Sequence, residues 1–108
     1  MGVLQVSASP VVSVIMPARN CAAYVAEAVQ SILGQTFGDL ELLIADDAST
    51  DGTLDILQGF TDSRITLIRH EAPAGSAETR NELFARARGE YIALMDADDI
   101  SLPERLEK

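Results

Sequence analysis

The chain has 108 residues and a mass of 11.6 kDa, which bounds it to one compact domain at most. Apolar residues make up 47% of it, which excludes an intrinsically disordered chain. Its 17 Asp+Glu against 8 Lys+Arg give a net charge of −9, and this acidity argues against nucleic acid as a partner, because a phosphate backbone requires a basic face. The single cysteine excludes an intrachain disulfide.

Targeting signals are not recognisable in the sequence. No apolar run approaches the ~20 residues that a membrane-spanning helix needs. Residues 1–10 lack a basic segment followed by an apolar stretch, so we expect no secretion signal and a cytoplasmic location.

The chain then begins with a strand and a helix. Residues 11–16 form an almost continuous apolar and β-branched run that Pro17 ends, which is typical of a strand buried on both faces. Asn20 is a good helix N-cap. Apolar pairs four residues apart follow it up to Gly34, so a helix is predicted between these two residues.

A second strand and helix follow, and then a third strand. Residues 40–45 predict the second strand, and residues 46–52 predict a polar turn, because Asp and Ser bond to their own backbone. Apolar residues recur every three positions over 54–60, which predicts a short helix. Residues 64–69 alternate only loosely and predict a strand nearer the sheet edge.

The last elements lead into a strongly acidic run. A breaker at 73–76 precedes a third helix, which is expected to run to about Arg88 and to be capped by Gly89 in the left-handed conformation. Residues 91–95 predict the fourth strand, and the acidic residues 96–99 follow at once.

Four strands that alternate with helices predict right-handed crossovers between parallel strands. The expected fold class is therefore α/β: a three-layer α/β/α domain with a mostly parallel sheet. We expect this domain to occupy residues 11–108, after an N-terminal extension at residues 1–10.

Three polar segments follow strands and share one edge of this predicted sheet. They are residues 17–20, 46–47 and 96–99. Ligands of open parallel sheets bind at this edge, beyond the carboxyl ends of the strands. Crowded carboxylates repel one another unless cations or hydrogen-bond donors compensate them. The site is therefore either wide and solvated or occupied by a divalent ion.

The acidic run after the fourth strand suits a metal bound to phosphate. Asp96 and Asp98 are two residues apart at a strand end and would point the same way. Carboxylate oxygens suit Mg²⁺ or Mn²⁺, which commonly take further ligands from substrate phosphates. The chain has no glycine-rich phosphate loop, so a metal would neutralise a diphosphate in its place.

Five segments resemble, in the right order, the sequence pattern of family 2 glycosyltransferases. They are residues 14–20, 31–36, 44–53, 80–81 and 89–99. The resemblance implies the GT-A fold, a Rossmann-like fold of nucleotide-diphospho-sugar transferases. It also implies metal-dependent transfer of a sugar from a nucleotide donor, a UDP-sugar above all, to a hydroxyl of a saccharide or lipid-linked acceptor. Transfer would invert the anomeric centre and serve cell-envelope polysaccharide synthesis.

The resemblance also assigns roles to individual residues. Asp47 would hydrogen-bond the base, Asp96 would contact the ribose, and Asp98 would bind the Mn²⁺ or Mg²⁺ that bridges the donor diphosphate. Arg80 would lie near the base and phosphates. The remaining expected nucleotide-sugar contacts come from two strand ends and are Pro17, Ala18, Arg19, Asn20 and Ala97. Arg19 stands where the family usually has Tyr, which removes an aromatic surface near the base.

The family's catalytic domain is longer than this chain, and its general base lies in the part that would follow Lys108. Inverting transfer needs a base within hydrogen-bond reach of the acceptor hydroxyl. We therefore expect the chain to be the donor-binding half, with no catalytic residue of its own. A sheet cut after its fourth strand would leave an exposed edge, which favours a homo-oligomer. In the complete protein, a location at the inner membrane surface is also consistent with the resemblance.

Other interpretations remain open from the sequence alone. A non-catalytic nucleotide-binding or interaction module would have the same fold. A phospho-accepting receiver domain fits less well, because the first strand ends in Pro17 and no Lys precedes Lys108. Asp47 could instead shape a turn, and Arg80 could be a solvated surface residue. The single histidine, His70, is expected to be structural or exposed.

Overall fold

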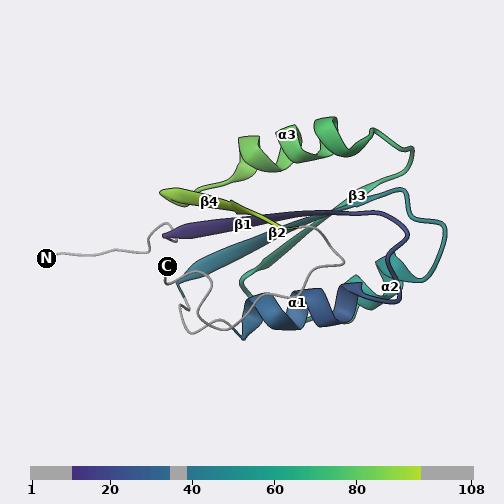
Figure 1. Cartoon of the computed structure of the whole chain (residues 1–108), viewed down its shortest axis with the longest axis horizontal. Helices are drawn as coiled ribbons and strands as arrows, with labels where there is room; N and C mark the ends of the chain where they lie inside the picture. The colour runs from purple at the N-terminus through teal and green to yellow at the C-terminus, as the bar shows by residue number, and fades with distance from the viewer. Residues whose placement is uncertain (1–10, 35–38, 96–108) are drawn as a thin grey trace, which may run out of the picture.

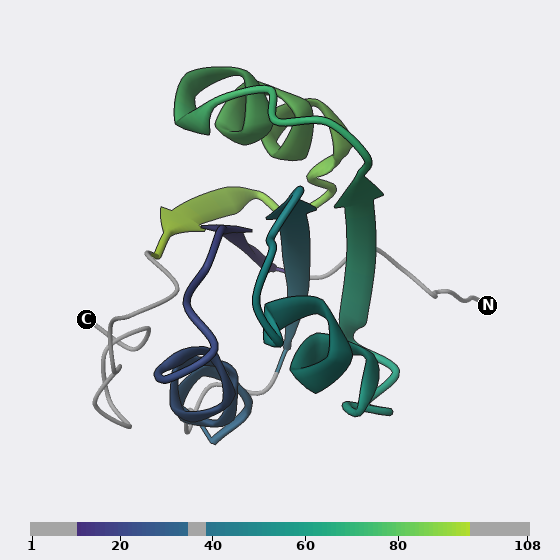
Figure 2. The ribbon, with the colours of Figure 1, turned by 90° about the vertical axis from the view of Figure 1, so that its right-hand side faces the viewer.

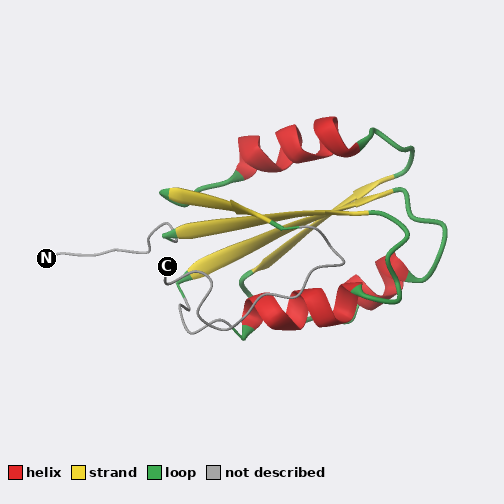
Figure 3. Cartoon of the chain, in the orientation of Figure 1, coloured by secondary structure: helices red, strands yellow, loops and turns green. Residues whose placement is uncertain are grey.

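The structure is a computed structural model that describes residues 11–34 and 39–95. Its elements along the chain are β1 (Val12–Ala18), α1 (Val25–Leu33), β2 (Leu40–Asp47), α2 (Thr53–Gln58), β3 (Ile65–His70), α3 (Ser76–Arg86) and β4 (Tyr91–Leu94). The strands form one parallel, 4-stranded sheet in the order β3-β2-β1-β4 (Figure 1 and Figure 3). Figure 2 shows α3 on one face of this sheet and α1 and α2 on the other. The predicted three-layer α/β/α fold is confirmed.

The two faces of the sheet carry separate cores, because successive side chains of a strand point to opposite faces. On the side of α3, the core consists of Ile15, Leu43, Ala45 and Leu83. The larger core lies under α1 and α2 and contains Val12, Val14, Met16, Ala18, Val25, Ala28, Val29, Ile32, Leu40, Leu42, Ile44, Leu57 and Met95. Both central strands face a core on each side, which explains why their sequences are continuously apolar rather than alternating.

β1 continues through Pro17, so the prediction that Pro17 ends the first strand was wrong. Pro17 pairs with Ala45 of β2 although it has no N–H to donate. Alternate residues of a strand direct their N–H and C=O groups to opposite neighbours, and the carbonyl of Ile15 accepts from Met95 N–H on the β4 side. Pro17 therefore faces that same side, two residues beyond Ile15 of the last described β1–β4 pair, Ile15–Leu94, so its missing N–H interrupts none of the described pairs.

β2 also extends further than its apolar residues, and every residue from Leu40 to Asp47 is buried. Asp46 and Asp47 were predicted to lie in a turn, but they end the strand and pair with Arg69 and His70 of β3. An apolar pattern cannot detect this extension, because the two acidic side chains are stabilised by hydrogen bonds: Asp46 by Ser49 in the following loop, and Asp47 by residues in distant segments.

α1 begins later than predicted. Asn20 is not its N-cap; the helix starts at Val25, after a turn in which the carbonyl of Cys21 accepts from Tyr24 and Val25 N–H. Asn20 lies outside this turn in the left-handed conformation, with a φ of 50°. Gly34 ends the helix as expected.

The turn between α3 and β4 also differs from its prediction. α3 ends at Arg86, and Gly89 is not in the left-handed conformation. Glycine is required there because a Cβ atom would lie 2.7 Å from the Ser13 backbone nitrogen. Gly89 N–H donates to Ser13 Oγ (2.8 Å), Ser13 Oγ donates to Glu41 Oε2 (2.5 Å), and Arg88 N–H donates to the same oxygen (2.8 Å).

Among the described residues, no helix combines the length and apolarity needed to cross a membrane.

Candidate nucleotide-binding cleft

A cleft of about 310 Å³ opens at the carboxyl ends of β1 and β2, the edge predicted to hold the ligand. Its lining residues are Pro17, Ala18, Arg19, Asp47, Gly75, Ser76 and Thr79. The structure therefore brings together the first three of the predicted strand-end residues and Asp47 from β2. The parallel register causes this, because it places Pro17 beside Ala45 and Ala18 beside Asp46 at the same edge.

The opposite wall of the cleft is the start of α3. Gly75 precedes the helix with a φ of 92°, a backbone conformation that residues other than glycine rarely adopt. Ser76 opens the helix, and Thr79 lies one turn further on. The hydroxyl of Thr79 is buried and is without a hydrogen-bond partner in the described part of the chain. Sequence reasoning did not identify these three residues, because nothing in their spacing relates them to the ends of β1 and β2.

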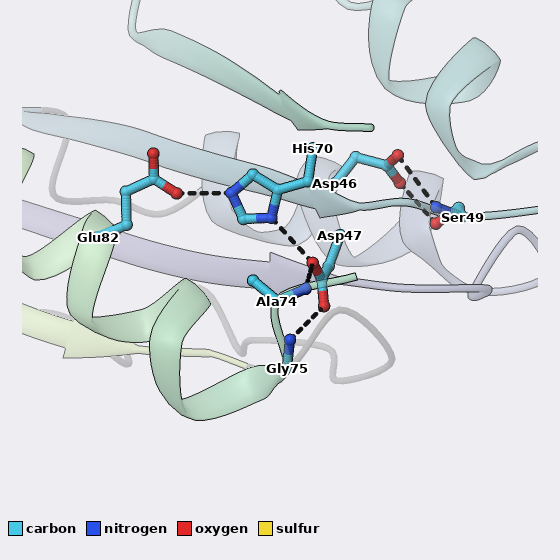
Figure 4. Close-up of polar contacts among 7 residues, drawn as sticks. All are labelled: Asp46, Asp47, Ser49, His70, Ala74, Gly75 and Glu82. Carbon is cyan, nitrogen blue, oxygen red and sulfur yellow. Dashed lines mark hydrogen bonds and ion pairs between the residues drawn. The ribbon is translucent and has the colours of Figure 1, made fainter. Parts of the chain in front are cut away.

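Asp47, at the end of β2, connects the two walls, and Figure 4 shows its carboxylate directed at Ala74 and Gly75. The Asp47 side chain is buried; its Oδ1 accepts from Ala74 N–H (2.8 Å) and its Oδ2 accepts from Gly75 N–H (3.0 Å). A third contact joins Oδ1 to His70 Nδ1 at 2.8 Å. Burial acts to raise the pKa of Asp47, but the hydrogen bonds from Ala74, His70 and Gly75 outweigh it and hold the pKa below its usual value. The carboxylate therefore stays ionised at the edge of the cleft.

The sequence left open whether His70 is structural or exposed, and the structure shows that both of its ring nitrogens have partners. Its other ring nitrogen, Nε2, lies 2.6 Å from Oε1 of Glu82 on α3, so the imidazole bridges two carboxylates from different elements (Figure 4). The hydrogen bond to Asp47, and next the one to Glu82, raise the pKa of His70. Neither contact has a sequence signal, because the partners lie 23 and 12 positions away along the chain.

Asp46 takes a different role from Asp47, although the two are adjacent. Its carboxylate accepts from Ser49 N–H (3.3 Å) and Ser49 Oγ (2.5 Å), away from the cleft. Figure 4 shows the two carboxylates directed away from each other, as alternation along a strand requires. Asp46 and Asp47 are therefore not a pair of ligands for one ion.

Asn20 and Arg80 lie beside the cleft rather than in its lining. Asn20 connects two loops: its Oδ1 accepts from Thr50 N–H (2.7 Å), and its own N–H donates to Ser49 Oγ (2.9 Å). Arg80 is half-buried on α3, directly after Thr79. The nucleotide contacts predicted for these two residues stay predictions.

The predicted metal ligand cannot be placed from the described residues. Asp96, Ala97 and Asp98 lie outside them. Within residues 11–34 and 39–95, no three His, Cys, Asp or Glu side chains gather as a metal would require. Asp47 is engaged by three donors, so it does not fit a metal-ligand role; a site would depend on Asp98.

Comparison with known proteins places the chain in a family. It matches the sequence model of glycosyl transferase family 2 over residues 13–108. It is 41% identical over 96 residues to the Escherichia coli protein WfgD, named UDP-Glc:alpha-D-GlcNAc-diphosphoundecaprenol beta-1,3-glucosyltransferase. That match covers 89% of this chain and 38% of WfgD. The chain spans about two fifths (38% to 40%) of the length of several curated relatives.

Solved structures of glycosyltransferases have the same arrangement of elements. TarS of S. aureus, in its segment 1–349, matches with a TM-score of 0.83 and 31% identity over 90% of this chain and 30% of that chain. TarS has been solved with UDP and with UDP-GlcNAc. The mannosyltransferase PcManGT from Pyrobaculum calidifontis, solved with GDP-Man and Mn²⁺, matches with a TM-score of 0.81 and 30% identity over 93% of this chain and 31% of that one.

These neighbours carry the GT-A fold, and the sheet described here forms part of it, as the sequence resemblance implied. The family match covers nearly all of the described sheet and its helices. The chain belongs to glycosyltransferase family 2.

Proposed function

We propose that the cleft binds the nucleotide of a nucleotide-diphospho-sugar, most simply a UDP-sugar, and that this chain is the donor-binding half of a glycosyltransferase. The observation that carries the proposal is the ionised carboxylate of Asp47 in the cleft wall. A carboxylate has about four lone-pair positions, and three of those of Asp47 are taken by Ala74, Gly75 and His70. The remaining position suits the ring N–H of a uracil base. Binding of UDP by the similar protein TarS supports this assignment.

The other lining residues suit the same ligand. The exposed guanidinium of Arg19 can stack on the face of a base, in place of the aromatic ring that the family usually has there. Pro17 and Ala18 offer apolar surface beneath it. The buried hydroxyl of Thr79, which has no hydrogen-bond partner among the described residues, gains one if a polar ligand atom reaches it. Asn20 and Arg80 border the cleft, and we propose that Arg80 contacts the phosphates of the donor.

The acidic run beyond β4 would complete the donor site. We assign Asp96 and Ala97 to the ribose side of the donor and Asp98 to a Mn²⁺ or Mg²⁺ ion. When bound, this ion would neutralise the donor diphosphate and stabilise it as the leaving group. The Mn²⁺ found with GDP-Man in PcManGT supports the metal assignment.

The reaction proposed for the complete protein is an inverting sugar transfer. The acceptor hydroxyl oxygen attacks the anomeric carbon from the face opposite the diphosphate, the carbon–oxygen bond to the diphosphate breaks, and the hydroxyl proton passes to a general base. The name of WfgD, with its diphosphoundecaprenol-linked acceptor, supports a saccharide or lipid-linked acceptor. For the complete protein we also propose a location at the cytoplasmic side of the inner membrane. We place the general base outside this chain, so the chain alone would bind donor without transferring sugar.

A calorimetric titration with UDP tests the donor site. The chain should bind UDP, and Mn²⁺ should raise the affinity by about tenfold or more, since it compensates the diphosphate charge. Asp98→Ala should remove the Mn²⁺-dependent part of the affinity and leave the fold intact. Asp55→Ala, which removes an exposed acid on α2, is the matched control and should behave as the unmodified chain. Equal UDP affinity with and without Mn²⁺, or full Mn²⁺ dependence in Asp98→Ala, would refute the metal assignment.

A further inference from the structure

His70 lies between two carboxylates that come from different layers of the fold. It ends β3, its Nδ1 is 2.8 Å from Asp47 at the end of β2, and its Nε2 is 2.6 Å from Glu82 on α3 (Figure 4). The exposed fraction of its side chain is only 15%, against 6% for Asp47 and 33% for Glu82. Both contacts are short; the contact with Asp47 is shielded from water, whereas Glu82 is partly exposed.

These two contacts require a particular protonation state. An ionised carboxylate only accepts hydrogen bonds, and a neutral imidazole has a single N–H to donate. Both ring nitrogens of His70 can therefore donate only when the ring is an imidazolium. The other charged groups nearby are Arg86, which lies 3.5 Å from Glu82, and Arg69 and Glu71, which flank His70 in sequence. The raised pKa of His70 agrees with this geometry.

The imidazole acts on the cleft through Asp47. The same carboxylate that contacts His70 accepts from Ala74 N–H and Gly75 N–H, and these two residues lead into the cleft wall formed by Gly75, Ser76 and Thr79. His70 fixes the direction of the Asp47 carboxylate and compensates its buried charge. His70 itself is not one of the residues that line the cleft.

We propose that His70 is a positioning residue of the nucleotide cleft: as an imidazolium held by Glu82, it orients the Asp47 carboxylate and, through it, the backbone of Ala74 and Gly75. The proposal rests on the proposed function, since it concerns the same cleft. When His70 loses its proton, one of the two contacts loses its donor, and the wall loses its fixed position. Nucleotide affinity should therefore fall as the pH rises through the titration of His70.

The test is the UDP affinity of the chain measured from about pH 5.5 to about pH 8.5, across the range in which histidine titrates. For the unmodified chain we expect about tenfold weaker binding at the alkaline end, the size expected for one charge-assisted hydrogen bond. His70→Gln should bind UDP at this weaker level throughout. Glu82→Gln should keep the affinity at low pH but move the midpoint to lower pH, because one of the two carboxylates that favour the imidazolium is removed.

Two controls separate this effect from general electrostatics. The terminal phosphate of UDP itself titrates at about pH 6. The dependence of UDP affinity on pH in His70→Gln is therefore the baseline for the unmodified chain and the other variants. Arg69→Gln removes an exposed positive charge beside His70 and should retain the midpoint of the unmodified chain. If His70→Gln has the affinity and the pH profile of the unmodified chain, His70 does not position the cleft.

A second measurement needs no ligand. His70 is the single histidine, so its ring signals in a nitrogen-15 NMR spectrum are unambiguous. The amide signals of Ala74 and Gly75 should shift with the same midpoint as the His70 ring. If UDP fails to bind at every pH, the proposed function is wrong, and these amide signals alone decide whether His70 positions the wall. A His70 titration that leaves both amides unmoved would overturn the proposal. Should His70→Gln fail to fold, Glu82→Gln carries the same comparison.

Discussion

At the scale of single residues, β2 tolerates buried carboxylates at Glu41 and Asp47 because each accepts several hydrogen bonds. Glu41 lies far from the cleft, near the start of the strand, and accepts from Ser13 Oγ and from the backbone and guanidinium of Arg88. Burial acts to raise the pKa of Glu41, but the hydrogen bonds from Ser13 and Arg88 outweigh it, so the pKa is lowered. Both carboxylates are thus kept ionised by local donors.

Removal of the Glu41 carboxylate should therefore destabilise the domain. In Glu41→Ala, Ser13 Oγ and Arg88 N–H lose their acceptor, and we expect the free energy of unfolding to fall by about 2 kcal/mol. Urea denaturation measures this change. Glu90→Ala, at an exposed position near the same turn, is the control and should change stability by less than about 0.5 kcal/mol. Equal stability of the two variants would show that the Glu41 contacts contribute nothing.

Gly89 provides a second prediction at this scale. In Gly89→Ala the new Cβ would meet the Ser13 nitrogen at 2.7 Å and the Val12 carbonyl carbon at 2.8 Å, both of them backbone atoms of the central strand. We expect a loss of about 1–3 kcal/mol in the free energy of unfolding, as for other overpacked sites. Gly52→Ala is the matched control, because no atom lies within 4 Å of its Cβ position. A stable Gly89→Ala would mean that β4 can move away from β1 at little cost.

The titrating residues also predict how stability depends on pH. The lowered pKa values of Asp47 and Glu41 contribute stability that is present above their ordinary values of 3.8 and 4.5 and is lost as the pH falls. The raised pKa of His70 contributes stability that is present below 6.5 and is lost as the pH rises through the folded value. The free energy of unfolding should therefore be greatest between pH 4.5 and pH 6.5.

Urea denaturation at a series of pH values tests this profile. His70→Gln should flatten the decline on the alkaline side and leave the acidic side in place. The series should stop below pH 9.0. Burial raises the pKa of the Cys21 thiol above its ordinary value of 9.0, so its titration would add a second decline in the free energy of unfolding. Stability that is constant between about pH 6 and about pH 8.5 in the unmodified chain would contradict the assignment to histidine.

At the scale of elements, the loops after β1 and β2 form one hydrogen-bonded unit next to the cleft. Asn20 contacts Ser49 and Thr50, and two further contacts follow: Cys21 N–H donates to Thr53 Oγ1 (2.9 Å), and Ala22 N–H donates to Asp51 Oδ2 (3.1 Å). This unit sets where β1 turns into α1. The position of Arg19, the exposed cation of the cleft, depends on it because Arg19 directly precedes Asn20.

Two substitutions of Asn20 separate its backbone role from its hydrogen bonds. Asn20→Ala removes the acceptor for Thr50 N–H and also strains the φ of 50°, whereas Asn20→Gly removes only the acceptor. We expect Asn20→Ala to lower the free energy of unfolding by about 1 kcal/mol more than Asn20→Gly, the cost of a left-handed residue with a side chain. Thermal denaturation of both variants measures the difference. A less stable glycine variant would show that the conformation at this position costs little.

The sequence predicted the order of these elements well but not their ends. Apolar runs located β1 and β2 because both strands are buried on two faces. Their last residues were missed: Pro17 is accommodated by the direction of its backbone, Asp46 by Ser49 in the following loop, and Asp47 by partners far along the chain. The site divides in the same way. Strand ends gather by topology alone, whereas the contacts of His70 depend on the packing of α3, which no local pattern encodes.

At the scale of the whole molecule, the described sheet has β4 at one edge with apolar side chains in contact with solvent. Tyr91 is 67% exposed, Ile92 43% and Leu94 40% (Figure 2 shows the position of β4). Edge strands with exposed apolar residues favour association with another chain. The expected homo-oligomer would use this edge.

A charge on β4 should therefore weaken self-association. Ile92→Lys is expected to lower the apparent molecular mass in light scattering, because a charged edge strand resists pairing. Tyr24→Lys is the control, since Tyr24 is similarly exposed but stands at the start of α1, on another face. A chain that is monomeric before any substitution would refute the prediction outright.

The strand order carries a consequence for how the protein is made. β1 precedes the other described strands along the chain, yet one of its two neighbours is β4, the last of them, and Gly89 N–H reaches Ser13 across 76 positions of the chain. Until β4 is synthesised, β1 lacks its partner on one side. Contacts between distant segments slow folding, and during this delay the partly folded chain exposes apolar surface and is prone to aggregate. Nascent chains of this domain should therefore depend on chaperones up to the moment when β4 clears the exit tunnel.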